Sequence, residues 1–141
     1  MILLDTDHLS VLKYTDNERY ARLHGRLLAA APEPIGTTIV NVEEQMRGWL
    51  AAIAKERTLL RQITTYRELA DLFDFFAKIN IVSLTAEAVD LFNGFRKSGV
   101  KVATMDLKTA CIAIASNALL LTANRRDFEK VPGLRFENWL E

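Results

Sequence analysis

Short apolar runs alternate along this chain with longer stretches in which apolar residues recur at helical spacing. Continuous apolar or β-branched runs at 2–4, 35–40, 81–84 and 119–122 are typical of strands buried on both faces of a sheet, and 135–137 is a fifth, shorter candidate. Because helical stretches separate these runs, the pattern predicts a three-layer α/β/α fold. Its central sheet should be mainly parallel and contain four to five strands.

Capping residues and one long periodic stretch define the predicted helices. Asp7 is positioned to cap the first helix, Asp16 the second, and Asn41 a long helix behind the second strand. Apolar residues recur at helical spacing throughout 42–79, with a break near Thr58. We therefore expect two consecutive long helices there, arranged as a helical hairpin.

The composition fits one globular domain that spans residues 1–141. Half of the residues are hydrophobic, and a chain of this length buries about two thirds of its unfolded surface. Eighteen basic residues balance eighteen acidic ones, so only local patches can attract nucleic acid. Cys111 has no partner for an internal disulfide, and no apolar run reaches the roughly 18 residues of a membrane span. We expect a soluble, cytoplasmic protein without membrane contact.

Acidic residues follow the predicted strands or open the predicted helices. Asp5 directly follows the first strand, and Asp106 begins an apolar helix at about 107–117. Glu43 and Glu44 lie in the first turn of the helix behind the second strand. The carboxyl ends of parallel strands meet at one edge of a sheet, so these acids should converge. Carboxylates at about 4 Å repel by about 4 kcal/mol per pair, and a hard divalent cation offsets that repulsion, which predicts a Mg²⁺ or Mn²⁺ site.

Two choices within this acidic set stay open. Composition alone does not show whether Glu43 or Glu44 belongs to the metal site, because the helix dipole favours a carboxylate at either position. After the fourth strand, either Asp127 or Asn124 should face the site while the other caps a turn. Both pairs therefore contribute candidates to the predicted metal site.

Motifs spread in order over nearly the whole chain resemble the PIN-domain ribonucleases, specifically the VapC toxins of type II toxin–antitoxin systems. Each motif is weak alone, whereas the ordered set is fairly specific. The motifs are LLDTDHLS at 3–10, Thr38 with an acid six residues on, EQMRG at 44–48, Asp106 ahead of IAIA at 112–115, TANRRDF at 122–128 and the closing NW at 138–139.

The resemblance implies a compact α/β/α fold, a Mg²⁺ or Mn²⁺ site, endoribonuclease activity on RNA, inhibition by a cognate antitoxin protein, and a homodimer. The family's E-x-x-x-G spacing, which ends on Gly48, selects Glu44 over Glu43. Thr6 matches the small hydroxyl residue that accompanies the first acid. Carried over by position, the catalytic and metal-binding residues are Asp5, Glu44, Asp106 and Asp127, with Asn124 as a further metal ligand.

This chain departs from the family at two positions. It has Gln45 where the family usually has Leu, which bears on the choice of Glu44, and Asn124 where many members have an acid, which bears on the fourth ligand. Basic residues beside the acids are candidate contacts to RNA phosphates. These are Arg47, Lys108, Arg125 and Arg126.

Large hydrophobic residues of the predicted hairpin have two interpretations. They are either ordinary core or a surface for a second copy or for an amphipathic antitoxin segment, and the resemblance favours the interface. They are Trp49, Leu50, Phe73, Phe75 and Phe76.

Two other functions fit parts of the pattern. The Asp5-Thr6-Asp7 sequence after a strand also resembles the start of the haloacid-dehalogenase phosphatases, but that class needs a further acidic pair near the last strands, which is absent here. A catalytically silent PIN-like module that binds RNA or protein is the second alternative. The intact, ordered set of acids favours the nuclease over both.

Overall fold

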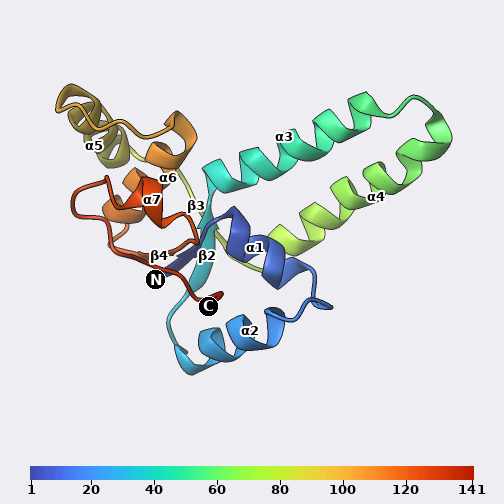
Figure 1. Ribbon diagram of the computed structural model, residues 1–141, viewed down its shortest axis with the longest axis horizontal. Helices are drawn as coiled ribbons and strands as arrows, with labels where there is room; N and C mark the ends of the chain where they lie inside the picture. The colour runs from blue at the N-terminus through green and yellow to red at the C-terminus, as the bar shows by residue number, and fades with distance from the viewer.

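The computed structural model describes all 141 residues and contains five strands and seven helices (Figure 1). None of the helices combines the length and hydrophobicity that a bilayer span requires. The elements in chain order are β1 (Ile2–Leu4), α1 (Thr6–Lys13), α2 (Tyr20–Ala29), β2 (Ile35–Thr38), α3 (Ile39–Lys55), α4 (Leu59–Phe76), β3 (Asn80–Val82), α5 (Ala86–Lys97), α6 (Thr104–Ala115), β4 (Leu119–Leu121), α7 (Arg125–Phe128) and β5 (Phe136–Glu137).

The strands form one sheet in the order β3-β2-β1-β4-β5, and every neighbouring pair is parallel. This confirms the predicted α/β fold with a mainly parallel sheet of four to five strands. β1 occupies the centre, where Leu3 pairs with Gly36 of β2 and with Leu120 of β4. The carboxyl ends of β1, β2 and β4 therefore lie side by side.

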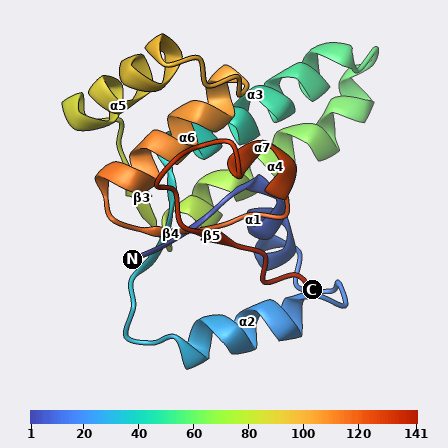
Figure 2. The same ribbon diagram turned by 60° about the vertical axis from the view of Figure 1, so that its left-hand side comes forward.

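Helices cover both faces of the sheet, as Figure 2 shows from a second direction. Successive side chains of β1 point to opposite faces. Leu3 belongs to a core cluster with α5, α6 and α7, whereas Ile2 and Leu4 belong to a second cluster with α1, α2 and the base of the α3–α4 pair. Three layers result, with the apolar helix α6 buried against the sheet.

α3 and α4 pack against each other and project from the body as a long arm (Figure 1). Apolar side chains at the far end of this arm are exposed, with Leu59 at 83% and Leu60 at 78% of their full accessibility. The large hydrophobic residues considered above divide between core and surface. Phe76 is buried, Trp49 and Phe75 are half-buried, and Leu50 and Phe73 are exposed.

Three predicted helix starts are wrong in detail. The cap of α1 is Asp5, which accepts a hydrogen bond from the next backbone N–H, so Asp7 lies inside the first turn. The cap of α3 is Thr38, and Asn41 lies inside the helix. α2 begins at Tyr20 without a side-chain cap. The first two shifts share a cause: each helix starts directly after its strand, so the polar residue at that junction becomes the cap.

Candidate active site

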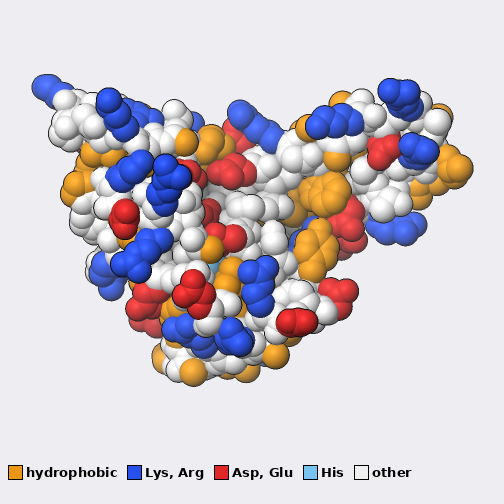
Figure 3. Space-filling view, in the orientation of Figure 1, with side chains coloured by type: hydrophobic (Ala, Val, Ile, Leu, Met, Phe, Trp, Pro, Cys, Tyr) orange, Lys and Arg blue, Asp and Glu red, His pale blue; other side chains and the backbone are white.

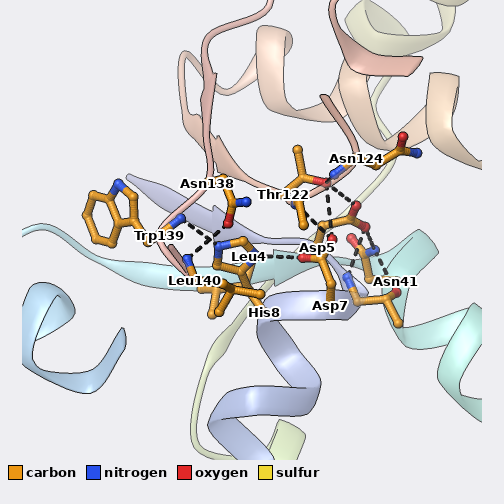
Figure 4. A network of polar contacts seen from close by, with 12 residues as sticks. Leu4, Asp5, Asp7, His8, Asn41, Thr122, Asn124, Asn138, Trp139 and Leu140 are labelled. Carbon is orange, nitrogen blue, oxygen red and sulfur yellow. Dashed lines mark hydrogen bonds and ion pairs between the residues drawn. The ribbon is translucent and has the colours of Figure 1, made fainter. Parts of the chain in front are cut away.

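Asp5 is the most firmly held acid at the carboxyl edge of the sheet (Figure 4). Its Oδ1 accepts hydrogen bonds from the Thr6 backbone N–H at 2.9 Å and from Asn41 Nδ2 at 2.8 Å, and its Oδ2 accepts one from Thr122 Oγ1 at 2.8 Å. Only 8% of the residue is exposed. Burial raises the pKa of Asp5 above its ordinary value, although these hydrogen bonds act in the opposite direction.

The donors that hold Asp5 are themselves fixed. Thr38 Oγ1 donates to Asn41 Oδ1 at 2.7 Å and accepts from the Asn41 N–H at 3.1 Å, while Thr122 Oγ1 accepts from the Asn124 N–H at 3.1 Å. The sequence pattern predicted only a capping role for Asn41 and no role for Thr122. The available signal was a polar residue shortly after each of the two strands that flank β1, three residues after β2 and one residue after β4.

Glu44 from α3 and Asp106 from α6 lie within electrostatic range of Asp5. Burial raises the pKa of Glu44, and the charges of Asp5 and Asp106 raise it further. Burial likewise raises the pKa of Asp106, together with the charges of Asp5 and Asp127. No lysine, arginine or histidine forms an ion pair with Asp5, Glu44 or Asp106. The chain thus gathers negative charge here without neutralising it.

Neighbouring acids Glu43 and Glu44 have different surroundings. Glu43 forms an ion pair with Arg47 at 2.5 Å on the exposed side of α3. Glu44 instead lines a cavity together with Thr6, on the side that faces Asp5. Of the two, Glu44 is the residue that the fold brings to the acidic cluster.

Asn124 and Asp127 form a pair at the start of α7. Asn124 accepts a hydrogen bond from the Asp127 N–H at 3.4 Å and donates one to Asp127 Oδ2 at 3.0 Å. The charge of Asp127 contributes to the raised pKa of Asp106, so this carboxylate reaches the acidic cluster electrostatically. Asn124 caps α7 and orients Asp127.

Asp7 lies next to Asp5 in the same network, since Thr122 Oγ1 is 3.4 Å from Asp7 Oδ2, but its other partners differ (Figure 4). The Trp139 N–H donates to Nε2 of the buried His8 at 3.1 Å, so the ring proton lies on Nδ1, which donates to Asp7 Oδ1 at 2.5 Å. Asp7 Oδ2 accepts from the Ala123 N–H at 2.8 Å. Burial acts to raise the pKa of Asp7, but the hydrogen bonds from His8 and Ala123 outweigh it, and the net pKa is lowered.

The acidic cluster has the right chemistry for a hard divalent cation, because its donors are all carboxylate oxygens with an amide nearby. In this structure no three His, Cys, Asp or Glu side chains lie close enough together to hold a metal ion. Glu44 and Asp106 are both half-buried. The space-filling view shows acidic side chains inside the hollow between the arm and the body, with Lys and Arg side chains along its rims (Figure 3).

Comparisons with known proteins agree with this architecture. The model of the PIN domain family matches residues 2–134, and the chain therefore belongs to that family. The chain is 32% identical over 69 residues to Ribonuclease VapC2 of Rickettsia felis. That alignment covers 46% of this chain and only about half, 52%, of the relative.

Solved structures extend the similarity over the full length. The structure of VapBC2 from Rickettsia felis, bound to a DNA fragment from their promoter, matches with a TM-score of 0.74 and 23% identity over 99% of both chains. VapBC-1 from nontypeable Haemophilus influenzae matches with a TM-score of 0.77 and 19% identity over 100% of both chains. The expected PIN fold and the resemblance to VapC proteins are confirmed.

Proposed function

We propose that this protein is the toxin of a type II toxin–antitoxin system and acts as a Mg²⁺- or Mn²⁺-dependent endoribonuclease. The observation that carries the proposal is the cluster of Asp5, Glu44 and Asp106. Burial raises the pKa of all three, the charge of Asp5 raises the pKa of the other two further, and no cation of the chain pairs with any of them. Perturbed acids of this kind mark functional sites. The similarity to a protein named as a ribonuclease supports the same reaction.

The proposed metal ligands are Asp5, Glu44, Asp106 and Asp127, with Asn124 as a neutral oxygen donor. A bound Mg²⁺ or Mn²⁺ supplies charge neutralisation and makes a water molecule nucleophilic at neutral pH. The chain's own contribution is to hold the carboxylates in place. Asn41 and Thr122 restrain both oxygens of Asp5, and Asn124 orients Asp127.

Basic side chains near the acids contact the RNA backbone in this proposal. Lys108 lies two residues after Asp106, and Arg126 lies just before Asp127. Neither cation forms an ion pair within the chain, so both are available to phosphates. These local charges offset the repulsion between the acidic cluster and a polyanion.

The partners follow from the same assignment. The similar solved structures carry the names VapBC2 and VapBC-1, and we propose that a cognate antitoxin binds and inhibits this chain. The exposed apolar residues of the α3–α4 arm supply a surface for the antitoxin or for a second copy of the chain. A small adjacent reading frame that encodes a DNA-binding protein would be the expected genetic context.

Metal-dependent RNA cleavage tests the proposal. The wild-type protein should cut RNA in Mg²⁺ or Mn²⁺ and stop in EDTA, and Asp106→Asn and Glu44→Gln should each lower the rate by roughly 10²–10³-fold. Glu43→Gln is the matched control, because it removes the same charge from the neighbouring position and should leave the rate within about twofold.

Activity that survives both Asp106→Asn and Glu44→Gln would place the reaction elsewhere and overturn the assignment. Wild-type protein that binds RNA but never cuts it would identify a silent binding module instead.

A further inference from the structure

An open cavity of about 320 Å³ continues from the acidic cluster along α3. Its wall is a single face of the helix, because positions 44, 48 and 52, and positions 45 and 49, are spaced by four residues. The residues that line it are Thr6, Glu44, Gln45, Gly48, Trp49 and Ala52. The cavity therefore has an acid of the candidate site in its wall and an aromatic ring further along the same helix.

The cavity is open at Gly48, although packing inside the protein does not require a glycine at this position. A glycine inside a helix destabilises it by about 1 kcal/mol relative to alanine. A Cβ atom added at Gly48 would have no neighbour within 4 Å, so packing within the fold does not require glycine here. The absence of a side chain at this position instead keeps space free for a molecule outside the chain.

Trp49 and Gln45 give the cavity the two features that recognise a nucleobase. Trp49 is half-buried, packs against the core and lines the cavity, and Lys13 Nζ lies over its ring at 5.8 Å from the centroid. An exposed indole surface stacks on bases. Gln45 is also half-buried, and its side-chain amide makes no hydrogen bond within the chain, so it can donate to and accept from a base edge.

We propose that this cavity is a subsite for one base of the RNA, adjacent to the phosphate that is cut. In it Trp49 stacks on the base, Gln45 reads its edge and Gly48 leaves room for it. The distance along the axis from Glu44 to Trp49 is about 7.5 Å at 1.5 Å per residue, roughly the reach of one extended nucleotide. The inference rests on the proposed ribonuclease function and assigns the residues that select its cleavage sites.

The first test fills the cavity. Gly48→Met should fold normally, raise the KM for RNA by about tenfold, which corresponds to the loss of one stacked base, and leave kcat within about twofold. Gly94→Met is the matched control, because Gly94 also lies inside a helix with open space around its Cβ atom. This control should leave KM unchanged.

The second test reads base preference. Cleavage sites mapped on a mixed RNA pool should shift or broaden with Gln45→Leu and Trp49→Leu, while Gln62→Leu on α4 should preserve the wild-type pattern. An unchanged site pattern in both cavity variants, together with an unchanged KM in Gly48→Met, would overturn the subsite.

A binding measurement separates the subsite from the catalytic assignment. Short RNA oligonucleotides should quench the fluorescence of Trp49, seen as the difference between wild type and Trp49→Phe, even in protein that has been freed of metal. Quenching without cleavage would overturn the nuclease assignment and support the base subsite. Cleavage without quenching would support the nuclease assignment and overturn the base subsite. If Gly48→Met impairs inhibition by the antitoxin but not the KM for RNA, the cavity binds protein and the subsite is wrong.

Discussion

Two acidic regions of this molecule begin two residues apart and differ in almost every physical respect. In one, Asp7 accepts hydrogen bonds from His8 and from the Ala123 N–H, and its pKa is lowered. In the other, Asp5 lies with Glu44 and Asp106, and the pKa of each is raised. Burial acts on both regions in the same direction, so it does not explain the difference.

The difference between the two regions comes from the groups that the protein places around each carboxylate. Both carboxylate oxygens of Asp7 and both ring nitrogens of His8 have hydrogen-bond partners inside the protein, and these bonds link α1 to the β4–α7 connection and to Trp139. The Asp5 region gathers acids with no cation of its own. A carboxylate whose hydrogen bonds are satisfied inside the protein stabilises the fold, whereas a group of acids without a counter-charge needs a ligand.

Removing His8 should have the largest effect on stability. His8→Ala leaves the buried Trp139 N–H and one oxygen of Asp7 without their partner and creates a cavity, so we expect a loss of about 3 kcal/mol in the free energy of unfolding. His24→Ala is the control, because His24 is exposed on α2 and should change stability by about 0.5 kcal/mol or less. Urea denaturation measures both, and equal losses would contradict a structural role that is specific to His8.

Asp7→Asn should have a smaller effect that depends on pH. The substitution replaces one charged acceptor by an amide and should destabilise the protein by about 2 kcal/mol at pH 7. The folded-state pKa of Asp7 lies below the ordinary 3.8, so its stabilising contribution is complete above that pH and is lost as the pH falls through the folded value. Urea denaturation should therefore show the difference from wild type shrinking only below pH 3.8, while a constant difference would disprove the assignment.

Asp106→Asn should have the smallest effect on stability, and it should stabilise the metal-free protein rather than destabilise it. Its raised folded-state pKa gives a contribution that is present below the ordinary 3.8 and lost as the pH rises through the folded value, so at neutral pH the ionised group destabilises the metal-free fold. In EDTA the variant should melt a few degrees above wild type, measured by calorimetry, and Mg²⁺ should raise the Tm of wild type more than that of the variant. Asp90→Asn, on the exposed side of α5, should do neither.

Much of this arrangement is visible in the sequence, because strand runs and the acids that follow them are local patterns. The succession of strands and helices along the chain and the position of Asp5 at the end of β1 follow from that pattern. The partners of Asp5 do not, because Asn41 and Thr122 lie 36 and 117 residues away and meet it only through the strand order. Likewise, the different surroundings of Glu43 and Glu44 depend on which side of α3 faces the body.

The placement of β1 between β2 and β4 also constrains when the hydrogen bonds of Asp5 can form during synthesis. The first acid leaves the ribosome early, yet the hydroxyl that restrains its second oxygen belongs to Thr122, near the other end of the chain. A nascent chain that stops before β4 cannot close the sheet around Asp5. The hydrogen bonds that hold Asp5 are therefore complete only when most of the chain has been made.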